Sequence, residues 1–561
     1  MKWLLGLPVL VPLCASAVDI PVTRLDDPLP DGCSVGDCSL REAVLLANGL
    51  IGADRILLPA SASPYRLTRS GSAEDAGLTG DLDVNGALEI AGQGAVPVVV
   101  SQVAVDRILH LLGPGAATTL RNVHLQDGRG VTQGGAVLAI GAQLVIVDAG
   151  FTGNVATSNG GAIAARCPDS GANVTVIAIA SSDFDDNTAP QGGAVDVLGS
   201  TTNSCNVSID DSDFRSNEAT ALGGAIAMSQ AFAGSRLEIR DSFFDDNLVT
   251  GTTGAGNGGA VGLGSASITA NISDSIFIDN RAEGIITSRG GAAFNVDAIV
   301  RSIFLANTAR SGGALSGDDV EIEDSTFCDN VASQDGGALY ASLGQVRRST
   351  FCRNSASNEG GAMKFLAQAG DEVTIERSTF DANVAPTGGA IAIGNGGLWL
   401  YQSTFASVDV PAPGSTGTVL RYSGPQAAAN GSFVRLTGNI LRGTCSFANG
   451  IATVDLARHN ANSGGNTCGL SQVGAQFSNN VTFTPLGGIP LLALADNGGP
   501  TVTRLPTSVA GHPAIGRVPL AQCIEPDQRY FRTTDASCDA GAVDLDGAPP
   551  PDAIFASGFE S

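Results

Sequence analysis

Phe327-Cys328-Asp329-Asn330-Val331-Ala332, with Gly336-Gly337-Ala338-Leu339 shortly after it, is the stretch that decides the fold. The same pattern, Phe-x-x-Asn followed by Gly-Gly-Ala and an apolar residue, recurs along the chain at a mean spacing of about 28 residues. Regular repetition at this spacing is typical of a solenoid, in which every repeat forms one coil. The paired Phe and Asn positions are Phe151 and Asn154, Phe184 and Asn187, Phe214 and Asn217, Phe244 and Asn247, Phe277 and Asn280, Phe304 and Asn307, Phe327 and Asn330, Phe351 and Asn354, and Phe380 and Asn383.

A serine precedes the Phe by two residues in nine of these repeats, counting a last one that keeps Phe405 but has no Asn. These serines are Ser182, Ser212, Ser242, Ser275, Ser302, Ser325, Ser349, Ser378 and Ser403. The loss of the Asn after Phe405 indicates that the regular array ends there.

Stacked coils explain why these residue types recur. Equivalent residues of parallel coils lie about 4.8 Å apart, so inward Phe rings stack into a column. An Asn at each corner can donate a side-chain hydrogen bond to the equivalent Asn of the adjacent coil. Gly-Gly allows a turn that a Cβ would forbid. We therefore expect an all-β fold, a right-handed single-stranded parallel β-helix of the pectate-lyase-like kind. A leucine-rich horseshoe would need a Leu-based consensus and helices that this region lacks.

The residues before the repeats predict a cap for the open end of the stack. Residues 38–48 read Cys-Ser-Leu-Arg-Glu-Ala-Val-Leu-Leu-Ala-Asn, and Ser39 followed by Glu42 forms the pattern of a capping box. We expect a short amphipathic helix that covers the first coil and its unpaired strand edges.

Composition and charge limit the partners. The chain has 73 glycines among 561 residues. Its formal charge of −25 argues against nucleic acid and anionic lipid as ligands, because both are negatively charged. Residues 1–17 have the charged, apolar and small-residue order of a secretory signal, with cleavage expected after Ala17. No later stretch approaches the ~20 apolar residues of a membrane span. An exported protein, extracellular or at the cell surface, is therefore expected.

The cysteines are expected to form disulfides. Ten of the 11 cysteines remain once Cys14 of the signal is set aside, and they fall into local pairs in an oxidising compartment. Metal ligation is the alternative, but the chain has four His and no paired C-x-x-C motif. The expected pairs are Cys33 with Cys38, Cys167 with Cys205, Cys328 with Cys352, Cys445 with Cys468, and Cys523 with Cys538.

Three stretches resemble known families of exported bacterial proteins. Residues 38–43, with Thr-Gly-Asp-Leu-Asp-Val at 79–84, resemble the CSLREA domain. The nine coils with Phe-x-x-Asn and Gly-Gly-Ala resemble the chlamydial polymorphic outer-membrane proteins, which implies a β-helical surface adhesin. Residues 496–501, 513–516, 527–529 and 538–542 resemble the choice-of-anchor Q region, and the Ile-Phe-x-x-Gly-Phe-Glu ending resembles that of some exported proteins.

These patterns predict five parts. The signal takes residues 1–17, the CSLREA-type cap and first coils 18–100, and the β-helix 101–410. Irregular last coils and a region similar to choice-of-anchor Q take 411–545, and a Pro-rich tail takes 546–561.

Enzyme activity has to be considered, because many parallel β-helices are polysaccharide lyases or hydrolases. Acidic pairs such as Asp185-Asp186 recur with the repeat, which favours a solvated face over a catalytic pair. The Asn-Thr-Asp and Gly-His-Gly strings of β-helical polygalacturonases are missing from the sequence. A non-enzymatic adhesin-like protein, binding a glycan or cell-surface ligand and needing no cofactor, is the favoured function. A polysaccharide lyase or glycoside hydrolase on the same scaffold is the alternative.

Two features of the sequence are candidate binding sites, one for a cation and one for a larger ligand. Asp211, Asp241 and Asp274 occupy one row, three residues before successive Phe, and stacked carboxylates of this kind are candidates for weak Ca²⁺ binding. A plain surface charge row with Arg301 bridging its acidic neighbours is the other interpretation. Insertions at residues 166–174, 199–206, 248–257, 281–289 and 364–372 leave the stack as loops, where ligands are commonly bound.

Overall fold

The structure is a computed structural model. It describes residues 17–71, 74–167, 174–199, 204–230, 234–252, 254–284, 286–406, 418–424, 432–448, 454–463, 467–472, 476–482, 489–508 and 512–549. The predicted signal lies outside these residues except for Ala17, and the predicted tail lies outside them after residue 549.

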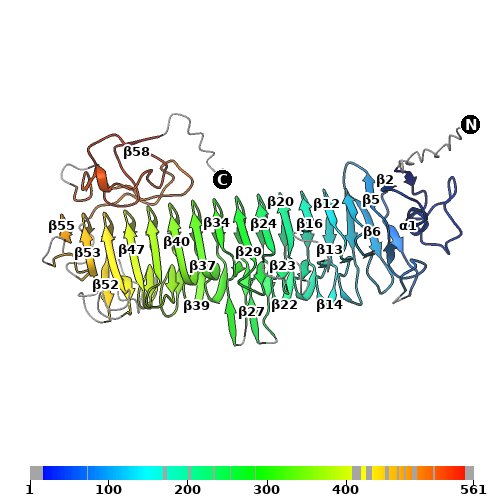
Figure 1. The fold of residues 1–561 in the computed structure, drawn as a ribbon, viewed down its shortest axis with the longest axis horizontal. Coiled ribbons are helices and arrows are strands. Elements are labelled where there is room, and N and C mark those ends of the chain that lie inside the picture. The colour runs from blue at the N-terminus through cyan, green and yellow to red at the C-terminus, as the bar shows by residue number, and fades with distance from the viewer. Residues whose placement is uncertain are drawn as a thin grey trace, which may run out of the picture.

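A row of stacked coils forms one long rod, with helix α1 (Leu40–Gly49) at its N-terminal end (Figure 1). All strand pairs of the rod are parallel. The coils from β10 to β42 contribute strands to three sheets, and the coils before and after them to two. The described part of the chain is therefore the expected parallel β-helix. None of its helices is long and apolar enough to cross a membrane.

The largest sheet, the long sheet, has 29 strands in two parallel rows that β37 and β40 join. The row that leads into each Phe contains β1 (Asp19–Pro21), β2 (Asp54–Pro59), β5 (Leu88–Gln93), β8 (Thr118–Arg121), β12 (Leu144–Val147), β16 (Val174–Ala180), β20 (Cys205–Asp210), β24 (Arg236–Arg240), β29 (Thr269–Ser273), β34 (Ala298–Val300), β37 (Leu315–Glu323), β40 (Leu339–Arg347), β44 (Glu372–Glu376), β47 (Gly397–Tyr401), β50 (Phe433–Thr437), β53 (Val454–Arg458) and β55 (Phe477–Ser478). The row that follows each Gly-Gly contains β4 (Leu82–Val84), β7 (Leu109–Leu112), β11 (Val137–Ile140), β15 (Ile163–Arg166), β19 (Val195–Leu198), β23 (Ile226–Met228), β28 (Val261–Leu263), β33 (Ala293–Phe294), β43 (Met363–Phe365), β46 (Ile391–Ile393), β49 (Thr418–Tyr422) and β52 (Thr444–Phe447).

A second sheet of 16 strands carries the Phe column and is called the Phe sheet below. Its strands are β3 (Tyr65–Leu67), β6 (Val98–Gln102), β9 (Val123–Gln126), β13 (Gly150–Thr152), β17 (Asp183–Asp185), β21 (Asp213–Arg215), β25 (Phe243–Asp245), β30 (Ile276–Ile278), β35 (Ile303–Leu305), β38 (Thr326–Cys328), β41 (Thr350–Cys352), β45 (Thr379–Asp381), β48 (Thr404–Ala406), β51 (Ile440–Arg442), β54 (Ala461–Asn462) and β56 (Val481–Thr482).

The third sheet, the short sheet, has 11 strands, which lie before the Gly-Gly of the coils from β10 to β42. They are β10 (Val131–Gln133), β14 (Ala156–Asn159), β18 (Thr188–Gln191), β22 (Glu218–Leu222), β26 (Leu248–Val249), β27 (Ala255–Asn257), β31 (Arg281–Ala282), β32 (Thr287–Arg289), β36 (Thr308–Ser311), β39 (Val331–Asp335) and β42 (Ser355–Ala356). Outside the rod, β57 (Val518–Pro519) pairs with β59 (Ser537–Cys538) and β58 (Arg532–Thr533) with β60 (Gly547–Ala548), both antiparallel, and a 3₁₀ turn covers Leu520–Gln522.

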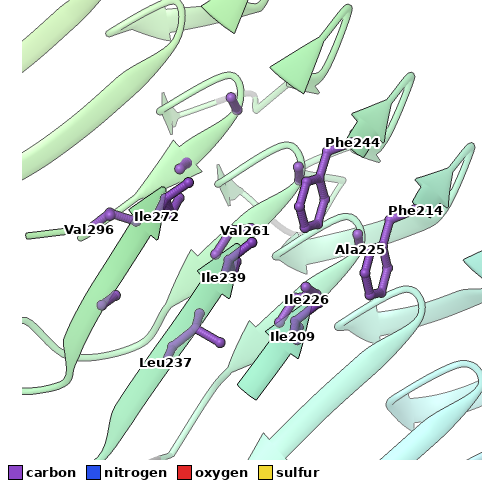
Figure 2. Packing of buried hydrophobic residues seen from close by; sticks show 14 of the residues in the cluster. Ile209, Phe214, Ala225, Ile226, Leu237, Ile239, Phe244, Val261, Ile272 and Val296 are labelled. Atoms are coloured by element: carbon purple, nitrogen blue, oxygen red, sulfur yellow. The ribbon is translucent and has the colours of Figure 1, made fainter. Parts of the chain in front are cut away.

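The repeated Phe side chains fill the interior. From Phe151 to Phe405 successive rings are stacked, with centroids between 4.5 and 5.2 Å apart. Figure 2 shows Phe214 and Phe244 beside the aliphatic side chains Ile209, Ile226 and Ile239 of the same core. The column runs the length of the regular array because each coil repeats the same residue at the same register.

The repeated Asn and Ser side chains connect the coils at two corners. Asn280 Nδ2 donates to Asn307 Oδ1 at 3.0 Å, and Asn307 in turn donates to Asn330 and to the carbonyl of Phe277. At the other corner the backbone N–H of Ser302 donates to the hydroxyl of Ser325 at 3.1 Å. Buried polar groups thereby find partners in the next coil, which fixes the register.

After Phe405 the corner changes from serine to asparagine. The backbone N–H of Ser403 donates to Asn439 Oδ1 at 3.0 Å, and the chain of amides continues from Asn439 to Asn460 and from Asn460 to Asn480. Leu441 takes the position of the next Phe. The stack therefore continues beyond the expected end of the array, with different residues at the same corner.

Helix α1 covers the first coils, and its predicted capping box is present: Ser39 Oγ accepts from the N–H of Glu42, and the Glu42 carboxylate accepts from Ser39 N–H. Arg41, on the same helix, is buried and forms a 2.8 Å ion pair with Asp27. Its guanidinium also donates to the carbonyls of Gly77 and Gly80. The helix is thus fixed to the loop before β4 as well as to the coils.

Disulfides join the five cysteine pairs that the sequence suggests, each between residues close in the fold. Cys328 and Cys352 follow successive Phe residues and have Cα atoms 4.6 Å apart. Cys167 and Cys205 link the ends of two loops of the long sheet.

Residues 489–508 and 512–549 fold back and pack on the outside of the Phe sheet (Figure 1, orange to red). Gln528 is fully buried and hydrogen-bonds to Thr350, Thr379 and Thr501. Arg377 is buried beneath this segment and donates to the carbonyls of Ile524 and Gly541. Below, this segment is called the covering segment.

Candidate functional site

The row of residues three positions before each Phe lies at a corner with positive φ. Asp211, Asp241 and Asp274 have φ of 45°, 47° and 52°, and Arg301 has 46°. Asp tolerates the left-handed region better than most residues with a Cβ, so its recurrence here has a backbone cause. The same holds for Asp186 and other second members of the acidic pairs.

The structure does not gather the three row carboxylates around one point. Asp211 and Asp274 are separated by two coil spacings, about 9.6 Å, which is too far for one cation to join all three. Asp274 instead forms a bidentate ion pair with Arg301, both contacts 2.6 Å long. Arg301 thus pairs with Asp274 as expected, whereas Asp324 pairs with Arg348 at 2.9 Å.

Two of the expected loops form a projection from the rod. Strands β27 and β32, from the insertions at 248–257 and 281–289, pair with each other and extend away from the coils (Figure 1). A groove of about 440 Å³ lies at the base of the projection, lined by Glu283, Ser288, Arg310 and Gln334 among others. The loops at 166–174 and 199–206 lie partly outside the described residues, which leave out 168–173 and 200–203.

An aromatic cluster lies on the outside of the long sheet, where the two preceding coils carry polar residues in register with it. Trp399 of β47 is in register with Thr374 of β44, and Thr374 with Gln345 of β40. The stretch Gly397–Tyr401 alternates, so that Leu398 and Leu400 point inward and are buried while Trp399 and Tyr401 point outward.

Four side chains form this cluster, called the aromatic patch below: Trp399, Tyr401, Phe433 and Arg435. The ring of Trp399 stacks beside Tyr401, with centroids 5.5 Å apart, and meets Phe433 edge-on at 5.3 Å. The guanidinium carbon of Arg435 lies 4.3 Å from the Trp399 centroid and 4.2 Å from that of Phe433. All four are partly exposed.

Neighbouring groups fix and charge the aromatic patch. Asp455 holds Arg435 by an ion pair of 2.9 Å, and Glu376 lies beside Tyr401 in the sheet. Burial raises the pKa of Tyr401, and the Glu376 carboxylate raises it further, so this phenol stays protonated and can donate. The predicted loop 364–372 borders the patch, because Gly397 N–H donates to the carbonyl of Asp371 at 2.7 Å.

Chemically, the aromatic patch fits a sugar. The C–H faces of a pyranose stack on aromatic rings, while a fixed guanidinium and a phenol supply hydrogen bonds to hydroxyl or carboxylate groups. Sequence reasoning missed this cluster, although a signal was present: Trp399 is the only Trp outside residues 1–17, and the alternation of its strand places it outward.

A second set of polar groups lies on the outside of the Phe sheet. His124, Gly150, Asp183 and Asp213 occupy one row on successive strands β9, β13, β17 and β21. Gly150 has no side chain, and a Cβ there would strike the His124 ring. The His124 ring therefore lies over Gly150, within range of the charge of Asp183.

The pKa values of this row are shifted. Burial raises the pKa of Asp183, and the Asp213 carboxylate adds to the rise, while Arg215 and His124 oppose it. Burial lowers the pKa of His124, although Asp183 opposes this.

A groove of about 540 Å³ beside the row is lined by Arg121, Asp148 and Asp183 from successive coils. A carboxyl group and an imidazole whose pKa values are shifted in this way are candidates for proton transfer.

Comparison with known proteins found one family, and no curated protein matches the chain. Residues 151–166 and 324–342 match the Chlamydia polymorphic membrane protein repeat. The first segment begins at Phe151 and the second contains Phe327 and Asn330, so both include the residues that build the core. Two of the coils of this parallel β-helix are thus similar to the Chlamydia polymorphic membrane protein repeat.

Proposed function

We propose that this protein is a surface-exposed, adhesin-like binding protein that holds a glycan against the aromatic patch. One observation carries the proposal: Trp399, Tyr401, Phe433 and Arg435 form an outward cluster, whereas the residues in register with Trp399 in the two preceding coils, Thr374 and Gln345, are polar. Trp, Tyr and Arg are the residues that dominate binding energy at interfaces.

Three further features support a location outside the cell. The N-terminal residues have the pattern of a secretory signal, the disulfides fit an oxidising compartment, and two segments match a repeat of polymorphic membrane proteins. The CSLREA and choice-of-anchor Q resemblances support the same location and an anchored state.

Binding of immobilised neutral and acidic polysaccharides by the full chain tests this function. Trp399→Ala should weaken binding of a recognised glycan by about tenfold or more, since truncating a central aromatic contact costs about 2 kcal/mol. Phe243→Ala is the matched control, because Phe243 is also an outward aromatic beside an arginine, Arg215, but on another sheet. Equal affinity of wild type and Trp399→Ala for every glycan that binds would refute the assignment.

The second candidate function is polysaccharide cleavage at the row of His124 and Asp183. The observation that favours it is the gathering of Arg121, Asp148 and Asp183 from adjacent coils around one groove. Cleavage would generate new chain ends during incubation with acidic or neutral polysaccharides, and Asp183→Asn would abolish it. Intact polysaccharide after prolonged incubation with wild type would exclude this candidate for the sugars tested.

A further inference from the structure

A histidine and two aspartates meet near the N-terminal cap, far along the chain from the aromatic patch. Asp83 of β4 and His110 of β7 are register partners in adjacent coils, and Asp75 comes from the loop before β4. His110 Nδ1 lies 3.3 Å from Asp83 Oδ1 and 3.7 Å from Asp75 Oδ1. One ligand atom of each residue lies within 4.8 Å of the other two.

The buried carboxylate of Asp83 is the main evidence for a ligand at this cluster. The residue has no exposed surface, and its Oδ1 makes no hydrogen bond although it faces the imidazole. Its other oxygen, Oδ2, accepts from the backbone N–H of Gly77 at 2.8 Å, which fixes the orientation of the carboxylate. A buried carboxylate oxygen without a hydrogen-bond donor is costly, and a cation shared with His110, whose Nδ1 lies 3.3 Å away, would satisfy it.

Arg107, three residues before His110, lies against a different carboxylate. Arg107 Nε forms a 2.6 Å ion pair with Asp81, which lies two residues before Asp83. Asp106 adds a further acidic group to the same neighbourhood. The cluster therefore combines an excess of negative charge with a buried, oriented and unbonded oxygen.

We propose that Asp75, Asp83 and His110 bind one divalent first-row transition-metal ion. Ligand atoms about 2.1 Å from a tetrahedral ion lie about 3.4 Å from one another, close to the separations of 3.3 and 3.7 Å between His110 Nδ1 and the two carboxylates. An imidazole with two carboxylates suits Zn²⁺ or Mn²⁺ better than Ca²⁺, which prefers oxygen ligands alone. Asp75 is exposed, so the ion enters from solvent and a water completes its coordination.

The site joins parts of the cap that are separate in sequence. Asp75 belongs to the loop whose carbonyls at Gly77 and Gly80 accept from Arg41 of helix α1, while Asp83 and His110 belong to the coils. A bound ion therefore cross-links this loop to the long sheet and stabilises the N-terminal end of the rod.

Calorimetric titration of the EDTA-treated, dialysed full chain with ZnCl₂ tests the site. Wild type should bind one ion per chain at this site and should have a higher Tm with Zn²⁺ than with EDTA. His110→Gln should lower the affinity about 100-fold or more, and Asp75→Ala about tenfold, each with loss of the Tm increase. Asp318→Asn, an exposed aspartate in a remote coil, serves as the control and should bind as wild type.

Folding of the variants does not limit this test, because Asp75 is exposed and its truncation leaves the core intact. Absence of saturable Zn²⁺ binding to wild type, or equal binding by wild type and Asp75→Ala, would overturn the proposal and leave an ion pair between His110 and Asp83. Either result is independent of whether the aromatic patch binds glycans.

Discussion

At the scale of single residues, the structure separates positions that build the stack from positions that are free to act. Phe, Asn, Ser and the first Gly of Gly-Gly recur because the interior and the corners require them. Gly336, for example, has φ of 65°, and a Cβ there would strike the backbone of Leu339. Functional differences between coils must therefore come from the outward residues.

The Asn column should be sensitive to single substitutions. Asn307 is fully buried, donates to Phe277 O and Asn330 Oδ1, and accepts from Asn280. Asn307→Ala leaves buried groups of two neighbouring coils without partners, so we expect a loss of about 2–4 kcal/mol in the free energy of unfolding. Denaturant unfolding measures it.

Asn358 provides the matched control for that substitution. Its side chain is exposed and hydrogen-bonds only to Asp335 in the described part of the chain. Asn358→Ala should change the free energy of unfolding by less than about 0.5 kcal/mol. If the two variants lost equal stability, the Asn column would not be a structural ladder.

Asp196 should make stability depend on pH. Burial raises its pKa to about 7, although Asn159 and Ser229 donate hydrogen bonds to it. Because the folded state keeps this proton while the unfolded state, with a pKa near 3.8, loses it, stability falls as pH rises from about 4 to about 7. Above pH 7 the destabilisation from Asp196 is complete and constant.

Asp196→Asn should remove this component of the pH dependence. The Tm of wild type relative to that of the variant should decrease between pH 4 and pH 7 and then level off. Thermal unfolding followed by circular dichroism at several pH values gives both curves. A difference in Tm that does not change with pH would show that the Asp196 carboxyl does not retain its proton in the fold.

At the scale of elements, local patterns predicted more than long-range ones. Helix α1 and the strands around each Phe were predicted from capping and alternation within a few residues. The packing of the covering segment on the Phe sheet was not predicted. It depends on contacts between residues far apart in the sequence, such as Gln528 and Thr379, which are 149 residues apart. No periodicity marks such a contact in a single sequence.

The same distinction applies to candidate sites. The residues Asp211, Asp241 and Asp274 were placed in one row correctly from the repeat, but a row is not a cluster, since stacked coils separate its outer members. Asp83 and His110 have no repeat to mark them, and their proximity depends on the register of β4 and β7. The aromatic patch likewise spans two strands, β47 and β50, with a long connection between them.

Gln528 should control how firmly the covering segment is held. Its amide donates to Thr350 and Thr501 and accepts from Thr379, all within 2.8 Å. Gln528→Ala removes three buried hydrogen bonds and leaves the Thr379 hydroxyl without its acceptor, so the covering segment should open more often. Hydrogen exchange should accelerate in this segment and stay unchanged in the Phe sheet near Phe214.

Asp535→Ala serves as the control within the same segment, because Asp535 is exposed. Its exchange rates should equal those of wild type. Faster exchange throughout the rod in Gln528→Ala would mean that the covering segment and the coils unfold as one unit, contrary to this account.

At the scale of the whole molecule, the parallel β-helix is a rigid support that presents different chemistry along its length. The proposed metal site of Asp75, Asp83 and His110 lies near the N-terminal cap, and the row of His124 and Asp183 follows it. The projection of β27 and β32 lies midway along the rod, and the aromatic patch lies in the later coils (Figure 1). Each uses outward residues and leaves the core pattern intact. Such separation is expected of a solenoid, whose coils contact only their neighbours.

The most direct test of the central claim, that the aromatic patch binds glycans, is the fluorescence of Trp399. A chain that begins at residue 18 contains this Trp and no other, so its emission reports on the patch alone. Titration with a glycan that the protein retains in a binding assay should shift the emission saturably, with the midpoint at the dissociation constant measured by that assay. Retention of the glycan with no change in Trp399 emission would contradict the account and place binding elsewhere on the rod.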